Sequence, residues 1–325
     1  MTYLSGGLIQ ATDYNGFLST VNGVWGTGSG DAGYGQTPLS TVSTGGTVTA
    51  TQWSNLLSTV SSMASHQGTS ISAISPSPVT GGTITYFNQL STNISAVTGS
   101  ADNNAAAVGT QYTAWTGTSG KTSSTGSGSA PWSIVFTHTI TWASANAARF
   151  FFNAGGIIKW QVGKSSTGTV ADPEWNDLAG TLCGAIFITG GTQTQTIAGT
   201  SYTGTTKIGG TGTPNTLLTT TGWYDLLTTD TLIYRQFADT SPYTGQSISI
   251  QARTAGSGTQ LVLDTTWSDP GGSAAGSTDA ISGGTAPSGV TLGTAPATVV
   301  SYFPPTTTFL TNSWGTPTVS ASVFA

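Results

Sequence analysis

The stretch Trp132-Ser-Ile-Val-Phe-Thr-His-Thr-Ile-Thr-Trp142 decides the fold class, because its large side chains recur at every second position. Ser133, Thr137, Thr139 and Thr141 take most of the places between them. Successive side chains of a β-strand point to opposite faces, so a period of two is typical of a strand with one buried face. The stretch therefore predicts a strand that lies on a hydrophobic core.

Further short strands are expected around this one, with turn residues between them. They cover residues 149–152, 157–162, 185–189, 231–237, 247–253, 260–264, 299–303 and 319–324. Many short strands separated by turns favour an antiparallel β-sandwich with jelly-roll-like connections, and residues 255–258 suit a hairpin turn. The predicted fold class is therefore mainly β.

One helix and one long loop are expected to interrupt the strands. Residues 172–178 read Asp-Pro-Glu-Trp-Asn-Asp-Leu, in which Asp172 suits the cap and Pro173 the first turn. Residues 269–296 are rich in Gly, Ser and Ala and contain Pro, so we expect a long loop or an extended arm.

The first hundred residues contain an internal repeat. Residues 9–21, IQATDYNGFLSTV, align without a gap with residues 48–60, VTATQWSNLLSTV, and Tyr14 matches Trp53. Apolar residues recur at helical spacing in both copies. We interpret each copy as a short extended segment followed by a helix, which is typical of a duplicated structural unit.

The ends of these helices can also be predicted. Thr12 or Asp13 is expected to cap the first helix and Thr51 the second, and Gly68 to end the second. A weaker third copy from Gly81 onward stays open. It would carry Tyr86, Leu90, Ile94 and Val97.

These patterns divide the chain into three parts. Residues 1–115 form a repeat region with short helices, residues 116–130 a Gly/Ser/Thr linker, and residues 131–325 a β-sandwich with long loops. The short helices carry Ser and Thr where a free-standing helix would carry Glu–Lys pairs. We therefore expect them to pack on one another or on neighbouring chains.

Charge is the most unusual feature of the composition. Only 6% of the 325 residues are charged, where an ordinary soluble domain has about a quarter. A net charge of −5 gives no positive field for phosphates, so nucleic acid is excluded as a partner. A surface so poor in charge is expected to face other protein.

The sequence shows no signal for a membrane or for export. No apolar stretch reaches the roughly 18 residues of a membrane span, and the first residues lack a secretory pattern, so we expect synthesis in the cytoplasm. The single cysteine, Cys183, is expected to be a small core residue. Abundant aromatic residues argue against a disordered spacer.

No catalytic, cofactor-binding or metal-binding residue is assigned from the sequence. The Gly-rich residues 25–36 lack both nucleotide-binding glycine patterns and a lysine, so we interpret them as a tight turn. His66 and His138 lie in different predicted elements and are not expected to share a metal. His138 shares an apolar strand face, which favours a buried, hydrogen-bonded histidine.

Two groups of carboxylates could be sites, but structural roles explain them better. Capping accounts for Asp172 and Glu174, which lie beside Asp177. A second group of acids brackets aromatic residues, as in many sugar-binding surfaces, although rings in the core and acids in turns are the favoured interpretation. This group comprises Trp223, Tyr224, Asp225, Asp230, Asp239 and Tyr243. The chain is therefore expected not to be an enzyme.

Several segments resemble virion structural proteins of tailed bacteriophages. They are Tyr14-Asn15, Val24-Trp25-Gly26, Gly33-Tyr34-Gly35-Gln36, Trp53, Leu57, His66-Gln67-Gly68-Thr69 and the stretch ARFFFNAGG at residues 148–156. The resemblance covers the first 70 residues and roughly residues 131–190. It implies a tail fibre, baseplate or neck component assembled in the host cytoplasm, and it carries over no catalytic residue.

The resemblance also implies partners. Fibres are commonly threefold, so a homotrimer is expected, with a ring of higher order as the alternative, in contact with other virion proteins. Two further classes stay open. A receptor-binding module would bind host surface glycan, and a secreted bacterial surface-layer or adhesin protein would share this composition but should carry an export signal.

Overall fold

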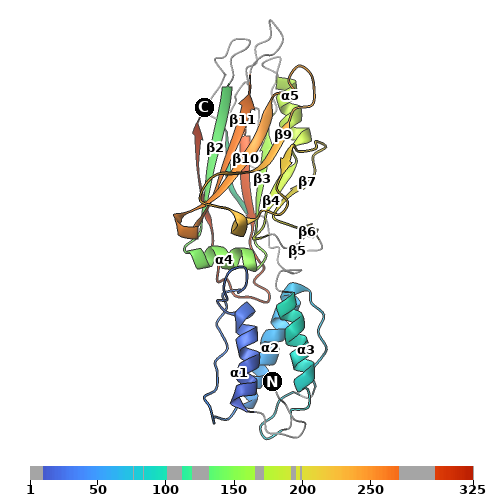
Figure 1. The fold of residues 1–325 in the computed structure, drawn as a ribbon, viewed down its shortest axis with the longest axis vertical. Coiled ribbons are helices and arrows are strands. Elements are labelled where there is room, and N and C mark those ends of the chain that lie inside the picture. Colours follow the sequence, from blue (N-terminus) through green and yellow to red (C-terminus); the bar gives the residue numbers. More distant parts are fainter. Residues whose placement is uncertain are drawn as a thin grey trace.

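The computed structural model describes residues 10–75, 77–82, 84–100, 112–118, 132–164, 172–191, 195–197, 200–270 and 297–324. A bundle of helices forms one end of an elongated molecule, and antiparallel β-sheets form the other (Figure 1). Helix α4 (Ala145–Asn153) lies where the two ends meet (Figure 1).

The bundle consists of α1 (Ala11–Trp25), α2 (Ala50–Gln67) and α3 (Phe87–Gly99). The first two are the helices predicted from the repeat, and the third falls on the segment that the sequence left open. Apolar side chains at helical spacing line the inside of all three helices. In α3 these include Leu90, Ile94 and Val97, which are buried.

Helix α2 begins earlier than its predicted cap. The Oγ1 atom of Thr49, not of Thr51, accepts from the N–H of Gln52 at 3.2 Å. The Gln52 side chain accepts from the N–H of Thr49 at 2.8 Å in return, which forms a capping box. Gly68 ends the helix in the left-handed conformation, as predicted.

Helix α1 also starts before the predicted position. The carboxylate of Asp13 accepts from the N–H of Gln10 at 3.1 Å. Gln10 therefore takes the cap position that the sequence assigned to Thr12 or Asp13. In both helices the residue three positions inside reaches back to the cap.

The three helices are parallel and run from the free end of the bundle toward the sheets (Figure 1). Near the free end the rings of Phe17 and Phe87 lie 4.6 Å apart. At the opposite end Nε2 of Gln67 donates to the carbonyl oxygen of Val97 at 2.9 Å. Parallel neighbours require connections that travel the whole length of the bundle. These connections, between α1 and α2 and between α2 and α3, are residues 26–49 and 68–86 and are here called the returns.

Side-chain amides hold the returns against the helices. Asn15 of α1 donates to the carbonyl of Val42 at 2.8 Å and accepts from its N–H at 2.9 Å. Asn93 of α3 bonds in the same two-way manner to Ser72, at 2.8 and 3.1 Å. Each amide supplies the partner that a neighbouring strand would otherwise give to an extended backbone.

Two antiparallel sheets form the other end. The five-stranded sheet has the order β1 (Tyr112–Thr118), β12 (Ala297–Phe303), β3 (Ile157–Gly163), β4 (Ala185–Ile188) and β7 (Thr205–Ile208). The six-stranded sheet has the order β13 (Thr318–Phe324), β2 (Trp132–Thr141), β11 (Gln260–Asp269), β10 (Ser247–Ala255), β9 (Thr231–Phe237) and β8 (Thr216–Leu217). Strands β5 (Gln195–Ile197) and β6 (Thr200–Tyr202) pair only with each other.

The two sheets share a core. The alternation predicted for β2 is confirmed, since Ile134, Phe136, His138 and Ile140 are buried. From the other sheet, Nε1 of Trp160 donates to Oγ1 of Thr265 at 2.8 Å, and its ring lies 5.9 Å from that of Tyr234. The inner faces of the sheets therefore pack against each other.

Most predicted strands are confirmed, but residues 149–152 form part of helix α4 instead. Ser144 caps this helix, because its Oγ accepts from the N–H of Ala147 at 3.0 Å. The run Phe150-Phe-Phe152 is buried throughout, and a continuous apolar run does not distinguish a helix from a strand. Described helices and strands occupy comparable shares of the chain, so "mainly β" understated the helices.

Other predicted elements are placed as follows. The helix expected at residues 172–178 is α5 (Asp172–Asp177), continued by the π-helical turn η1 (Leu178–Leu182). The predicted hairpin joins β10 and β11 through the 3-10 turn η3 (Gly256–Gly258). Strand β11 extends to Asp269, and residues 271–296 of the expected loop lie outside the described residues.

The boundary predicted after residue 115 needs correction. Strand β1 crosses it and pairs with β12, so the sheets take in residues that the sequence assigned to the helical region and to the linker. Residues 119–130 of the predicted linker lie outside the described residues.

Candidate functional site at the joint

The Gly-rich residues 25–36, here called the joint loop, follow α1 and contact α4 where the bundle meets the sheets. The loop folds back on α1, with the N–H of Tyr34 donating to the carbonyl of Val24 at 2.8 Å. Gly35 has a φ of 68°, and a Cβ atom there would lie 2.3 Å from the Phe150 ring of α4. A glycine is therefore required at this position both by the backbone and by the neighbouring ring.

Arg149 of α4 holds the joint loop by its backbone carbonyls. Its guanidinium donates to the carbonyl oxygens of Gly30 at 3.0 Å, Thr27 at 3.2 Å and Ala32 at 3.1 Å. A phosphate loop presents N–H groups to an anion, whereas this loop presents oxygen atoms to a cation. The carbonyl oxygens of the predicted turn therefore have a structural partner in α4.

Asn153 and Tyr224 extend the contact on the same side. Nδ2 of Asn153 donates to the carbonyl of Gly33 at 3.0 Å, and the hydroxyl of Tyr224 donates to Oδ1 of Asn153 at 2.6 Å. Burial raises the pKa of Tyr224 above its ordinary value, against the opposing effect of Arg149. The tyrosine therefore keeps its proton and remains a donor.

A second segment, residues 310–314, bonds to Tyr34 and Gln36 at the end of the joint loop and is here called the strap. Gln36 accepts from the N–H of Thr311 at 2.8 Å and donates to its carbonyl at 3.0 Å. The hydroxyl of Ser313 donates to the carbonyl of Tyr34 at 2.7 Å. Leu310 and Trp314, at the two ends of the strap, are buried.

His66 also belongs to the joint. It is fully buried at the end of α2, with Nε2 3.1 Å from the carbonyl oxygen of Ala154, which follows α4. The ring of Tyr34 packs edge-on against it at 5.3 Å. His138 lies on the inner face of β2, so the two histidines are not brought together. The described contacts of the joint thus come from backbone carbonyls, side-chain amides and hydroxyls, the Arg149 guanidinium and the His66 ring.

His138 and Cys183 are core residues, as predicted. Both side chains are fully buried. Burial lowers the pKa of His138 to about 3 and raises the pKa of the Cys183 thiol to about 12. At neutral pH the histidine is uncharged and the thiol is protonated, so neither is poised as a reactive group.

One acidic cluster forms at the far end of the sheets. Carboxylate oxygens of Glu174, Asp177 and Asp239 lie within 4.8 Å of one another. Burial raises the pKa of Glu174, while hydrogen bonds from Thr240 oppose the shift. Asp239 was not grouped with the other two from the sequence, because it follows β9, far along the chain. Exposed acidic groups often gather without a metal, so the cluster alone assigns none.

Asp225 lies in a turn, as predicted. Its carboxylate accepts from the N–H of Gly222 at 2.9 Å in the 3-10 turn η2 (Trp223–Asp225), and Trp223 is buried. Asp230 pairs with Arg253 at 2.5 Å. Asp239 belongs to the acidic cluster.

Comparisons with known proteins found no matching family model, no matching curated protein and no matching solved structure. Among the helices in the described part of the chain, none combines the length and hydrophobicity needed to cross a bilayer.

Proposed function

We propose that the chain is a non-enzymatic structural subunit of a bacteriophage virion, in a tail fibre, baseplate or neck appendage. The observation that carries this proposal is the uncharged surface of the helical bundle. Apart from His66, Asp13 and Asp31 are the only ionisable acidic or basic side chains among residues 11–100. The exposed positions of the helices carry Ser, Thr and Asn instead. They include Ser19, Thr20, Thr51, Asn55, Ser58, Ser61, Ser65, Thr92 and Ser95.

Such a surface suits permanent burial against protein. Moving an unpaired Lys or Glu into an interface costs several kcal/mol, whereas a hydroxyl needs only a hydrogen bond. Some of these hydroxyls already have one within their own helix. Oγ1 of Thr20 donates to the carbonyl of Gly16 at 3.2 Å, and Oγ1 of Thr92 to that of Asn88 at 3.1 Å. They can therefore be covered without losing a partner.

The arrangement of the chain fits such a role. The bundle would attach to the particle, and the sheets would project from it or clamp a neighbour. Strands from the beginning of the sheet region pair with strands from its end, as in β1–β12, β12–β3 and β2–β11. This order supports a jelly-roll-like sandwich. Helices α1 to α3, each followed or preceded by a return, support a duplicated unit in the N-terminal region.

We further propose that copies of the chain assemble with one another and with other virion proteins. A homotrimer is the expected state and a larger ring the alternative. The particle would form in the host cytoplasm. Contact of the projecting sheets with a host glycan would add a receptor-binding role to the same subunit.

The direct test is to purify particles from the source and search them for this chain by mass spectrometry, followed by cryo-electron microscopy. The proposal predicts several copies per particle and density that fits both the bundle and the sheets. Finding the chain on a bacterial cell surface, and not in particles, would favour the surface-layer or adhesin alternative. A glycan array probed with the full chain tests the receptor-binding alternative.

A further inference from the structure

Among the described elements, the three helices of the bundle all precede the strands, so the chain passes once from the bundle to the sheets. The bundle ends with α3 at Gly99, and the sheets begin with β1 at Tyr112. Units joined by a single connection normally move relative to each other, unless a well-packed interface prevents it. The orientation of the bundle therefore depends on the non-covalent contacts of the joint.

Two segments contact different parts of the joint loop. Helix α4 supplies Arg149, Phe150 and Asn153. The strap bonds to Gln36 and Tyr34, which are both buried. A guanidinium is a planar fork whose donors have fixed directions, so three carbonyls at Arg149 restrain rotation as well as separation.

We propose that the joint is a preformed lock that holds the bundle at one angle to the sheets, so that the chain acts as a rigid strut. The lock consists of the Arg149 contacts with residues 27–32 of the joint loop and the Gln36–Thr311 pair at the end of the loop. This inference goes beyond the virion role, because the lock is present in the isolated chain. Its test can therefore fail or succeed independently of any particle.

Distances between two spin labels measured by double electron–electron resonance test the lock. Labels would be attached at Ser58→Cys on α2 and Ser320→Cys on β13, both exposed. Cys183 is fully buried and should not take a label. The full chain should give one narrow distance distribution, and adding Arg149→Ala with Gln36→Ala should broaden it at least twofold. Circular dichroism should show that both ends remain folded.

Arg253→Ala is the matched control, because Arg253 pairs with Asp230 and Asp264 within the sheet region and lies outside the joint. It should leave the distribution narrow. A broad distribution in the unsubstituted chain, or a narrow one in the folded double variant, would overturn the proposal. If the double variant loses its fold, the same distance distribution is measured for Gln36→Ala and for Arg149→Lys as single variants. Narrow distributions in both single variants would also overturn the proposal.

Discussion

At the scale of single residues, several of the few charged side chains bind other groups of the same chain. Arg149 is one of only seven basic residues, and it is committed to backbone carbonyls of the joint loop. Arg253 is bound to Asp230 and Asp264, and the amine of Lys207 donates to the carbonyl of Gly212 at 2.6 Å. These three basic side chains therefore have partners within the chain.

His138 makes a residue-scale prediction about acid stability. The pKa of His138 is about 3 in the folded chain, below the ordinary value of 6.5. Between these two pH values the unfolded chain binds a proton at this histidine and the folded chain does not. The stability that the uncharged His138 gives to the folded chain is fully present above pH 6.5, and it is lost as the pH falls toward 3. The slope for this group is about 1.4 kcal/mol per pH unit.

His138→Leu should remove that slope while keeping a similar volume in the core. Chemical denaturation at pH 7 and pH 4 would measure the free energy of unfolding of both proteins. The variant should lose less stability between the two pH values than the unsubstituted chain. Equal losses in both proteins would show that His138 is not protonated on unfolding in this range.

At the scale of elements, regular patterns were predictable and irregular ones were not. The alternation in β2 and the helical spacing around Phe17 and Trp53 reflect one buried face, which the sequence records directly. The run at residues 150–152 has no alternation, so the cap at Ser144 decided its structure. Strands β5 to β8 are short and were not predicted, because two to four residues carry too little pattern.

The joint could not be predicted, although parts of it could. The glycines of residues 25–36 indicated a turn, but nothing in the sequence pairs Gln36 with Thr311, which lies 275 residues away. Contacts of this kind depend on the assembled fold. The grouping of Asp239 with Glu174 was missed for the same reason.

The amide contacts of the returns give a prediction at this scale. Asn93→Ala removes a buried amide and both of its hydrogen bonds to the backbone of Ser72. The free energy of unfolding should fall by about 1–3 kcal/mol. Asn88→Ala in the same helix is the control, because its exposed side chain should matter by less than about 0.5 kcal/mol. Equal effects of the two substitutions, measured by chemical denaturation, would contradict the role of the amide.

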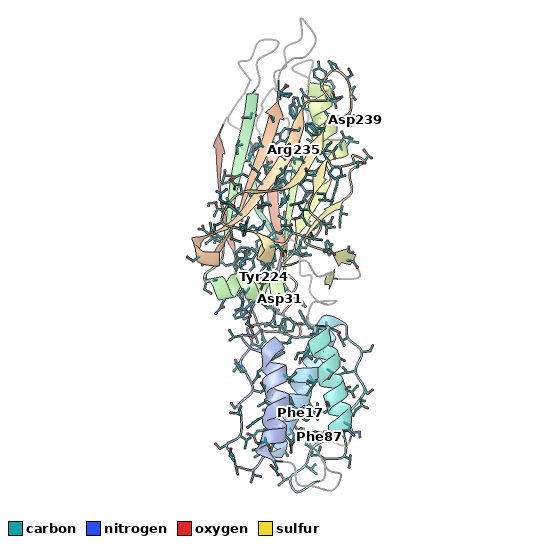
Figure 2. All side chains as sticks on the ribbon, viewed as in Figure 1. Phe17, Asp31, Phe87, Tyr224, Arg235 and Asp239 are labelled. Atoms are coloured by element: carbon teal, nitrogen blue, oxygen red, sulfur yellow. The ribbon has the colours of Figure 1, made fainter. Side chains whose placement is uncertain are left out.

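At the scale of the whole molecule, parallel helices and long returns place all three helix C-termini at the joint and leave the N-terminal ends free (Figure 1). Asp13 and Asp31 are the only Asp, Glu, Lys or Arg residues among residues 11–100, and Asp31 lies where the bundle meets the sheets (Figure 2). An isolated protein of this size normally relies on surface charge for solubility. A subunit whose surface is covered on assembly does not need it.

Size-exclusion chromatography with light scattering tests this claim most directly. At micromolar concentration the account predicts a molar mass that is a multiple of the 32.8 kDa chain, with three copies as the expected state. A ring of more copies would keep the claim and change the stoichiometry. A single, stable species of 32.8 kDa would contradict it, because the uncharged surface would then face water.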